Sequence, residues 1–584
     1  MGDPTHSASV PGTHTFCRPH RTMSQDVSTA GRLDKHQLAS AADAIRSQRP
    51  IQDFAPELGF EDASGLLRAI ADSMRLKLAD LTDIEIDEQI LEGFPVRLIH
   101  RYEVFPIAKE SDALVVALSN PFDFQAIDAL SAATGQIIQP VVSDPEQVRD
   151  LIKRFLGVGA ETIDGLLALQ KDEDLGELNS LTGQDLEDAE VAQQASVVRL
   201  VNEILSEAIE ARASDIHIEA QEKGIKIRYR IDGVLQRQPA PPEMNQFRSA
   251  IVSRLKIMAR LNIAEKRVPQ DGRIKIRVKG REVDIRVSII PMLHGEGIVM
   301  RVLDKENLRF SLADIGMPDD VYQRFQKLIR LPHGIILVTG PTGSGKTTTL
   351  YSALSEIQDE ETKIITTEDP IEYQLEGINQ IQVHKKVGLT FAASLRSILR
   401  HDPDVVLVGE IRDLETAENA TQASLTGHLV FSTLHTNDSA GAFMRLCDMG
   451  VEPFLVSSTV EGVMAQRLVR KLCPECREPD LRRQADLPDD FPYEQAKENG
   501  TVVYHPVGCS ACRGSGYRGR MGLYELLVAN DEIRDLATNQ AASNEIKKAA
   551  VRGGMKTLRQ DGWNKVMQGV TSIDEVLRVT KADA

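Results

Sequence analysis

The stretch Gly340-Pro-Thr-Gly-Ser-Gly-Lys-Thr347 decides the fold of the central part of this 584-residue chain. It matches the phosphate-binding loop pattern of Gly, any four residues, Gly, Lys and Ser or Thr. The apolar run 334–339 before it predicts a buried strand, and the residues from Lys346 to Leu354 predict a helix. A strand, a glycine loop and a helix in this order can hold polyphosphate on backbone N–H groups and a helix N-terminus. The alternative is a glycine-rich turn without a ligand.

The loop predicts a nucleoside triphosphate, ATP, bound together with Mg²⁺. In such a loop the lysine, Lys346, reaches the β- and γ-phosphates, and the hydroxyl of Thr347 binds Mg²⁺. The predicted phosphate-binding residues are Gly340, Pro341, Thr342, Gly343, Ser344, Gly345, Lys346 and Thr347.

Composition narrows the class of protein. Hydrophobic residues make up 42% of the chain, enough for several cores, and the length suggests three to five domains. The formal net charge of −18 disfavours general attraction to nucleic acid. No run of 18 apolar residues predicts a transmembrane helix, and the first 22 residues lack the apolar core of a secretory signal. Six cysteines do not make a disulfide framework in a chain of this size, so we expect a reducing compartment.

The order of predicted elements indicates a multidomain α/β protein. Strands alternating with helices around the glycine loop predict a parallel sheet with helices on its faces. Ser572-Ile-Asp-Glu575 predicts a capping box that opens the last helix. The expected parts are a disordered start (1–33, in which Met23 is an alternative first residue), a small α/β domain (34–155), an acidic linker (156–190), a second α/β domain (191–310), a nucleotide domain (311–470), a cysteine module (471–520) and a helical region (521–584).

Polar side chains follow three predicted strands of the nucleotide domain. Because ligands bind at the carboxyl ends of parallel strands, we expect these side chains to meet the phosphates. Glu368 is the candidate general base for the attacking water, and Glu410 can hold the Mg²⁺ shell or orient water. His435 is a candidate sensor of the γ-phosphate. The alternative is that the carboxylates only cap helices and that the histidine is structural.

The second α/β domain carries a basic stretch. From Arg254 to Arg286 there are eleven Lys or Arg and four Asp or Glu. Arg228 and Arg230 lie on one face of a predicted strand nearby. Three interpretations stay open: a nucleic-acid groove, a solvated basic face, or a surface that meets the phosphates of a neighbouring subunit. In the last case an arginine supplied in trans would stabilise charge on the transferred phosphoryl group.

Two Cys-x-x-Cys pairs predict a metal site. They are Cys473 with Cys476 and Cys509 with Cys512, separated by 32 residues. Four thiolates in paired knuckles suit structural, tetrahedral Zn²⁺. An iron–sulfur cluster and free thiols are the alternatives.

Several further blocks are similar to the secretion ATPase superfamily of the GspE/PilB type, and the likeness covers residues 190–584. These blocks are Ala213–Glu219, Ala264–Arg273, Thr367–Tyr373, Val408–Asp413, Leu425–Leu429 and Ser432–Asp438. In that superfamily Thr362–Tyr373 corresponds to the aspartate box, Val405–Glu410 to Walker B and Leu429–Asp438 to the histidine box.

The resemblance implies a RecA-like ATPase core preceded by a PAS-like domain at 191–310. It also implies a cytoplasmic homo-hexamer, peripheral on the inner membrane, with ATP at subunit boundaries. Its movements would push a membrane platform that assembles a pilus or pseudopilus. The cysteine module favours an extension motor over a retraction motor. Residues 94–155 resemble the domain that docks type II secretion ATPases on a bitopic inner-membrane partner.

Four functions follow as hypotheses. The first is a motor for type II secretion, and the second, with the same chemistry, is a type IV pilus assembly ATPase. A nucleic-acid motor and a nucleotide-gated scaffold without catalysis are the others. We expect no direct contact with nucleic acid, and contact with the membrane through partners.

Overall fold

The computed structural model describes residues 33–582 except 48, 50, 83, 85, 92, 93, 111, 158, 161, 164–182 and 305–310. The chain divides into two compact units, Met1–Ile152 and Lys153–Ala584. Residues 1–32 and 164–182 lie outside the described residues, and with them the predicted disordered start and most of the predicted linker. None of the described helices combines the length and the apolarity that a bilayer crossing requires.

The first unit is built around a small mixed sheet in the order β1-β4-β3-β2, in which only β2 runs antiparallel to its neighbour. The helices α1 to α3 form an apolar cluster of their own, which Val142 of β4 joins. The elements are α1 (Lys35–Arg46), α2 (Ile51–Phe54), α3 (Ala63–Met74), β1 (Lys77–Leu78), α4 (Val96–Tyr102), β2 (Val104–Glu110), β3 (Ala113–Leu118), α5 (Phe124–Thr134), β4 (Ile137–Val142) and α6 (Pro145–Leu156), with 3₁₀ turns at Pro56–Leu58 and Glu88–Leu91.

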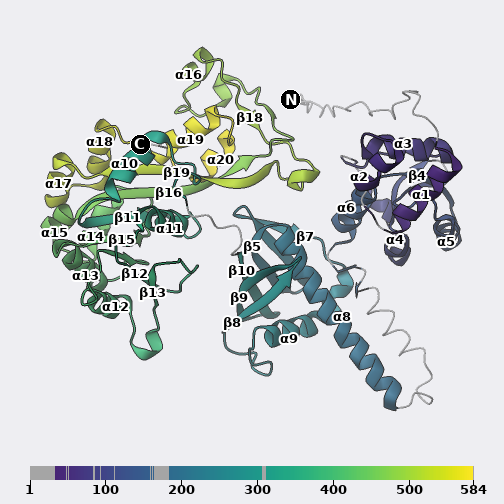
Figure 1. The fold of residues 1–584 in the computed structure, drawn as a ribbon, viewed down its shortest axis with the longest axis horizontal. Coiled ribbons are helices and arrows are strands. Elements are labelled where there is room, and N and C mark those ends of the chain that lie inside the picture. The colour runs from purple at the N-terminus through teal and green to yellow at the C-terminus, as the bar shows by residue number, and fades with distance from the viewer. Residues whose placement is uncertain are drawn as a thin grey trace, which may run out of the picture. The chain divides into compact units, whose positions relative to one another are not determined.

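The second unit begins with a six-stranded antiparallel sheet in the order β7-β6-β5-β10-β9-β8 (Figure 1). One face of α8 packs on it through an apolar stripe that includes Leu200, Ile204 and Ala208. The helix begins at Gly183, earlier than the expected Val197, so it includes part of the acidic segment. The elements are α8 (Gly183–Glu210), β5 (Ala213–Gln221), β6 (Gly224–Ile231), β7 (Val234–Gln238), a 3₁₀ turn (Pro242–Phe247), α9 (Arg248–Met258), β8 (Gln270–Val278), β9 (Arg281–Met292) and β10 (Gly295–Asp304).

The glycine loop belongs to a seven-stranded sheet in the order β13-β12-β14-β15-β11-β16-β19. All neighbouring strands are parallel except β16 and β19, which pair antiparallel. This order makes the core RecA-like, as predicted. The strands are β11 (Gly334–Thr339), β12 (Ile364–Glu368), β13 (Asn379–Gln382), β14 (Val405–Val408), β15 (Leu429–Leu434), β16 (Val460–Leu472) and β19 (Tyr517–Val528).

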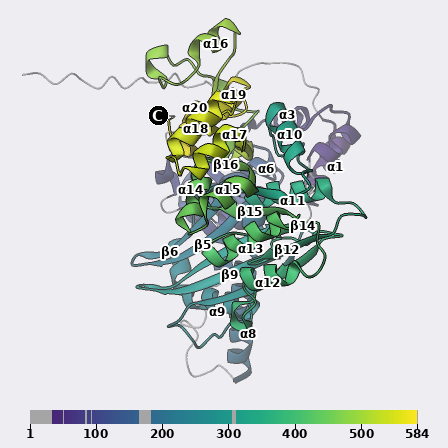
Figure 2. The same ribbon diagram turned by 90° about the vertical axis from the view of Figure 1, so that its left-hand side faces the viewer.

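Helices cover both faces of this sheet, because its central strands carry apolar side chains on both faces. On β11, Ile335 and Leu337 face one cluster, and Ile336 and Val338 face the other. Figures 1 and 2 show α12 to α15 together on one side of the sheet. The helices are α10 (Asp319–Leu328), α11 (Lys346–Ile357), α12 (Phe391–Ile398), α13 (Leu414–Leu425), α14 (Gly441–Asp448) and α15 (Pro453–Thr459), with a 3₁₀ turn at Lys385–Val387.

The C-terminal part differs from the prediction at one point. Residues 521–528 were expected to begin a helical region, but they belong to β19, the outermost strand of the main sheet. The strand pairs with β16 from Gly462 to Leu472, and its inward side chains, such as Leu523 and Leu527, are fully buried. The remaining elements are β17 (Glu478–Pro479), α16 (Tyr493–Glu498), β18 (Tyr504–His505), α17 (Asp531–Thr538), α18 (Ser543–Arg552), α19 (Leu558–Met567) and α20 (Ile573–Val579), with 3₁₀ turns at Gln484–Asp486 and Ser510–Cys512.

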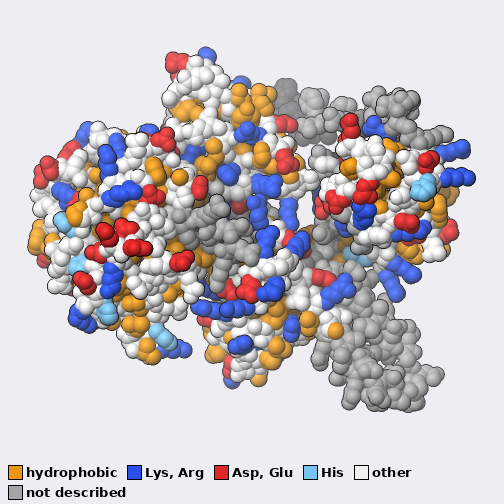
Figure 3. Space-filling model, viewed as in Figure 1, with side chains coloured by type: hydrophobic (Ala, Val, Ile, Leu, Met, Phe, Trp, Pro, Cys, Tyr) orange, Lys and Arg blue, Asp and Glu red, His pale blue; other side chains and the backbone are white. Residues whose placement is uncertain are grey.

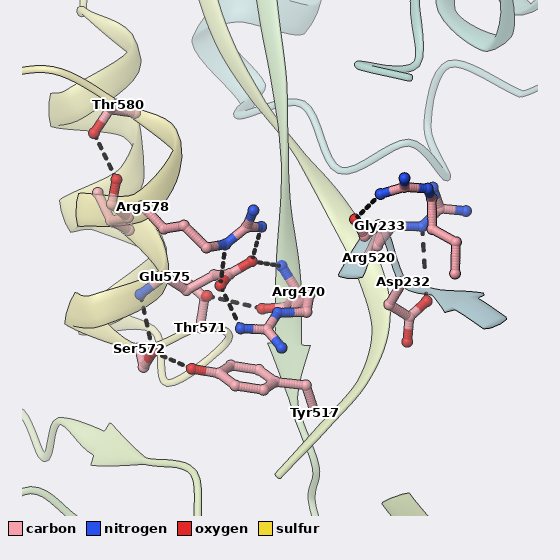
Figure 4. Close-up of polar contacts among 12 residues, drawn as sticks. Asp232, Gly233, Arg470, Tyr517, Arg520, Thr571, Ser572, Glu575, Arg578 and Thr580 are labelled. Atoms are coloured by element: carbon pink, nitrogen blue, oxygen red, sulfur yellow. Dashed lines mark hydrogen bonds and ion pairs between the residues drawn. The ribbon is translucent and has the colours of Figure 1, made fainter. Parts of the chain in front are cut away.

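The last helix is tied to the sheet by a buried carboxylate (Figure 4). Ser572 caps α20 by accepting from the N–H of Glu575, as predicted. The Glu575 carboxylate does not return to the cap, so the reciprocal half of the expected capping box is missing. It accepts instead from the N–H of Arg470 at 3.0 Å and its guanidinium at 2.8 Å, and from Arg578. These charged hydrogen bonds lower the pKa of Glu575 to about 2, although its burial acts in the opposite direction.

Candidate nucleotide site and cysteine cluster

The glycine loop needs three residues with backbone angles that favour glycine. Gly340, Gly343 and Gly345 have φ of 148°, 78° and 90°. Two of them also lie against β16. A Cβ on Gly340 would be 2.5 Å from the carbonyl oxygen of Gln466, and one on Gly345 would be 2.8 Å from its Nε2. The loop therefore requires glycine for its own turn and for the close approach of the neighbouring strand.

Lys346, the first residue of α11, points back over the loop. Its Nζ donates to the carbonyl oxygens of Gly340 at 2.8 Å and Pro341 at 3.1 Å. Burial lowers the pKa of Lys346 to about 8, Glu410 opposes this shift and Arg467 adds to it. An ammonium that is desolvated and bonded only to neutral oxygens gains from an anion in the loop.

The structure brings together the ends of the strands that carry Glu368, Glu410 and His435. In the sheet, Thr367 pairs with Val408, Val408 with Ser432, and Thr339 with Leu434. Glu368 ends β12 directly after Thr367. Glu410 follows Val408 by two residues, and His435 follows Leu434 by one. They therefore lie at the edge of the sheet where the glycine loop begins, as the alternation of strands and helices predicted.

Glu410 and His435 are in direct contact. His435 Nε2 lies 3.3 Å from Glu410 Oε2, and Arg412 Nε lies 2.7 Å from the same oxygen. The negative charge of Glu410 acts on the pKa of Lys346 in the direction opposite to burial, so the two groups interact electrostatically. A carboxylate and a histidine in contact with each other thus follow β14 and β15, at the edge of the sheet where the glycine loop with Lys346 follows β11.

Glu368 has a different environment. Its side chain is buried and accepts hydrogen bonds from Thr366 Oγ1 at 2.6 Å, from Gln380 Nε2 at 3.1 Å and from the hydroxyl of Tyr351 on α11. Burial raises the pKa of Tyr351, and the charge of Glu368 adds to this. In this conformation the carboxylate faces donors of its own domain.

Arg228 and Arg230 lie on β6 opposite β5. Arg228 forms an ion pair with Glu219, and Arg230 lies 3.6 Å from Asp215 and donates to the carbonyl of Gly233 at 3.0 Å. Neither makes a described contact with the glycine loop or with Glu368, Glu410 or His435. Within one chain, the structure does not place them at the nucleotide site.

Three residues at the site were not singled out from the sequence. Arg286 of β9 donates to the carbonyl of Ile371 at 2.9 Å and pairs with Glu372 at 3.3 Å, just after Glu368. Gln466 and Arg467 of β16 lie beside the loop, and Thr349 Oγ1 of α11 donates to Gln466 Oε1 at 2.8 Å. Arg286 belongs to the basic stretch that begins at Arg254, and that stretch was the sequence signal that could have identified it. Nothing in the spacing of β16 relates it to the loop, because β16 follows more than a hundred residues later.

The four cysteines of the two Cys-x-x-Cys pairs converge. Their sulfurs all lie within 4.8 Å of one another. The separations are 3.9 Å for Cys473 and Cys509, 3.8 Å for Cys476 and Cys512, and 3.7 Å for Cys509 and Cys512. Backbone N–H groups of Gly508, Cys509 and Gly516 point at the sulfurs of Cys476 and Cys512 at 3.1–3.3 Å. The cluster could hold a metal ion, because tetrahedral zinc thiolates place their sulfurs about 3.8 Å apart.

The nucleotide site and the cysteine cluster both lie in a region that matches a known protein family. A family model described as Type II/IV secretion system protein matches residues 190–578, and an MshEN domain matches residues 74–162. The chain is 46% identical over 497 residues to the type II secretion system protein E of Xanthomonas campestris, covering 84% of this chain and 85% of that protein.

Two further relatives belong to secretion and pilus machines. The type II secretion system ATPase E of Vibrio cholerae is 53% identical over 398 residues, covering 68% of this chain and 78% of that protein. The type IV pilus assembly ATPase PilB of Myxococcus xanthus is 44% identical over 512 residues, covering 86% and 89%. The matched region includes the glycine loop, the three strand ends and the cysteine cluster, so this chain belongs to the Type II/IV secretion system protein family and is a secretion ATPase.

Proposed function

We propose that this chain is the ATPase of a type II secretion system and that its hydrolysis of ATP drives pseudopilus assembly and protein export. The observation that carries the proposal is that Lys346 lies over the glycine loop, while Glu410 and His435, in contact with each other, follow strands that end at the same edge of the sheet. The high identity to type II secretion ATPases over most of the chain supports the choice of machine.

The roles of the site residues follow from their positions. The loop 340–347 cradles the phosphates, Lys346 exchanges its two carbonyl partners for phosphate oxygens, and the Thr347 hydroxyl binds Mg²⁺. Mg²⁺ bound with ATP would neutralise charge on the β- and γ-phosphates. Glu410 orients the attacking water, and His435, which contacts it, reports on the γ-phosphate. Glu368 acts as general base once its carboxylate exchanges one of its present donors for water.

We propose zinc as the metal of the cysteine cluster. Four sulfur donors without an open position are typical of structural Zn²⁺ sites. The residues present fit such an ion in number, chemistry and spacing. Bound zinc would fix Cys473, at the end of β16, to the knuckle of Cys509 and Cys512 before β19, and so would stabilise the edge of the ATPase sheet.

Assembly and location are proposed from the family. The chain would act as a cytoplasmic homo-hexamer with ATP at subunit boundaries, peripheral on the inner membrane through platform and bitopic proteins. An arginine from a neighbouring subunit would act in trans, for which Arg228 and Arg230 are the predicted candidates. Both would have to leave their present carboxylate partners to do so. Acidic and basic side chains are interspersed over the ATPase core on the face that Figure 3 shows, which does not favour a nucleic-acid stripe there.

A type IV pilus assembly ATPase is the second candidate. The relative of Myxococcus xanthus, with nearly the same identity over a similar share of both chains, favours it. Both candidates share every proposed catalytic role, so the geometry of the nucleotide site does not separate them.

Deletion of the gene in its native host separates them. Loss of exoproteins from the culture supernatant with surface pili retained is the result expected for type II secretion. Loss of pili with secretion retained would replace this proposal by pilus extension. Complementation by wild-type protein but not by a Lys346→Ala variant ties either phenotype to ATP hydrolysis, and equal complementation by both would favour a scaffold without catalysis.

A further inference from the structure

Arg467 lies on β16, the strand next to the one that leads into the glycine loop. Its guanidinium is partly buried. Nη1 donates to the carbonyl oxygen of Gln466 at 3.1 Å, and Nη2 donates to the carbonyl oxygen of Asn437 at 3.1 Å and to its Oδ1 at 3.2 Å. All these acceptors are neutral. Among the described residues no carboxylate lies within ion-pair distance of Arg467, and none of its described hydrogen bonds uses Nε.

The guanidinium borders the phosphate-binding loop. A Cβ on Gly340 would lie 3.1 Å from Arg467 Nη1. Lys346 Nζ donates to the carbonyl oxygen of the same glycine at 2.8 Å, so both cations lie next to Gly340. Asn437, its other anchor, follows His435 in the loop after β15. Thr436 of that loop is in turn bonded to Thr339 at the start of the glycine loop, with 2.6 Å between the hydroxyls.

The three buried cations among the described residues of the second unit each have a carboxylate partner. Lys256 lies 2.7 Å from Glu296, Lys565 lies 2.8 Å from Asp561, and Arg559 lies 2.7 Å from Asp490. Such pairing is expected, because a desolvated charge without a counter-charge is unfavourable. Arg467, which is half-buried, has no such partner in the described part of the chain, and it lies at the position where a polyanion is expected.

Two carboxylates whose charges act on the pKa of Arg467 do not serve as its ion-pair partner. Burial lowers the pKa of Arg467, and attraction to Glu525 and Asp438 opposes this. The carboxylate of Glu525, however, is already bonded to the N–H and hydroxyl of Ser439 and to the N–H of Leu558. Asp438 already accepts from the N–H of Gly441, the first residue of α14, at 2.9 Å. The guanidinium therefore keeps donors and a positive charge for a ligand.

We infer that Arg467 is a second cationic ligand of the nucleotide, supplied in cis, and that its guanidinium donates to a phosphate oxygen beside Lys346. The inference rests on the proposed binding of ATP at the loop 340–347. Arginine suits this place because its planar fork can hold Asn437 with one nitrogen and phosphate with another. A charge-assisted contact of this kind binds nucleotide before and after hydrolysis alike, so its removal raises Kd and KM more than it lowers kcat.

The competing role is a brace that only joins β16 to the loop after β15. Arg467→Gln distinguishes the two roles, because glutamine retains a donor toward Asn437 and removes the charge. We expect Arg467→Gln to raise the Kd of ADP with Mg²⁺ by about ten- to a hundredfold, as measured by titration calorimetry on the full chain. The affinity of the variant should also depend less steeply on KCl than that of the wild type. A Kd within twofold of wild type, or a raised Kd with unchanged salt dependence, would overturn the inference.

Two controls complete the experiment. Arg552→Gln removes an exposed arginine that pairs with Glu532 on the C-terminal helices, and it should leave the Kd unchanged. Lys346→Ala tests the site itself, since a variant that binds ADP like the wild type would contradict the proposed function rather than the role of Arg467.

A measurement on the wild type serves if Arg467→Gln does not fold. Arginines are labelled with phenylglyoxal with and without ADP and Mg²⁺, and the modified positions are mapped by mass spectrometry. Protection of Arg467 by ADP, with Arg552 labelled equally in both samples, is the expected result. Equal labelling of Arg467 in both samples would overturn the inference.

Discussion

Cations at the nucleotide loop and cations around the last helices occur in opposite environments. Lys346 and Arg467 are bonded to carbonyl and amide oxygens. Arg470, only three residues further along β16, is paired with Glu575 at 2.8 Å and lies 3.9 Å over the ring of Tyr517 (Figure 4). The same strand thus carries one arginine without a counter-charge and one with two partners.

This difference distinguishes the proposed nucleotide-binding region, where Lys346 and Arg467 are bonded to neutral oxygens, from the C-terminal region, where Arg470 is paired with a carboxylate. A buried ion pair such as Arg470–Glu575 needs no ligand and loses stability when one partner is removed. A desolvated cation among neutral oxygens is less stable without its ligand and gains when an anion arrives. The C-terminal region, including the cysteine cluster, therefore supports β16, the strand that lies beside the proposed nucleotide site.

The largest effect is expected from the cysteine cluster. Cys473→Ser should remove about one zinc ion per chain and unfold the module, because structural zinc binding contributes on the order of 10 kcal/mol of apparent free energy to small zinc domains. Metal analysis and thermal unfolding measure both consequences. Cys447→Ser, which changes a cysteine outside the cluster, is the matched control. Iron in the purified protein, or a stable protein without metal, would contradict this prediction.

The second effect concerns hydrolysis. Lys346→Ala should lower ATP turnover about a thousandfold, equivalent to about 4 kcal/mol, because the lysine is a principal cation at the transferred phosphoryl group. Release of phosphate by the full-length protein measures it. Unfolding should be unchanged, since Lys346 bonds only to loop carbonyls. Turnover that survives the substitution would mean that the loop is not the catalytic site.

The third effect should appear in stability and not in nucleotide binding. Glu575→Ala leaves Arg470 and Arg578 without their shared carboxylate and should destabilise the attachment of α20 by about 3 kcal/mol. Hydrogen exchange of the α20 amides reports this locally. Asp574 lies on the same helix, α20, and its exposed carboxylate pairs with Arg482. Asp574→Ala should therefore cost less than about 1 kcal/mol of stability. Equal effects of the two variants would show that the pair at Glu575 has no special role.

The smallest effect is a pH dependence of binding. Free Lys346, with a pKa of about 8, loses its proton as the pH rises above 8, whereas a bound phosphate favours the charged form and raises that pKa. Binding therefore takes up a proton above pH 8, and the affinity for ADP should fall about tenfold between pH 7 and 9. In Lys346→Arg the guanidinium stays protonated, so this part of the dependence should disappear. A fall of the same size in that variant would assign the titration to another group.

Local patterns predicted much of the nucleotide domain. The glycine loop, the alternation of strands and helices, and the polar residues Glu368, Glu410 and His435 at the strand ends can be recognised in short stretches of sequence without knowledge of the fold. Parallel strands bring their carboxyl ends to one edge, so the meeting of Glu410 and His435 could be expected. The prediction was wrong at β19, because an apolar strand that closes a sheet edge resembles a buried helix segment when taken alone.

The sequence by itself indicated a phosphate-binding glycine loop, a cluster of four thiols and membership of the secretion ATPases, because each of these features depends on residues close together in the chain or at fixed spacing. Only the tertiary structure decided which groups complete or restrain the site. It buried Glu368 under Tyr351, paired Arg228 and Arg230 with carboxylates on β5, and placed Arg467 beside Gly340. The physical reason is that the ionic partners of a side chain, and the extent of its desolvation, are set by strands that the fold brings together from distant parts of the chain.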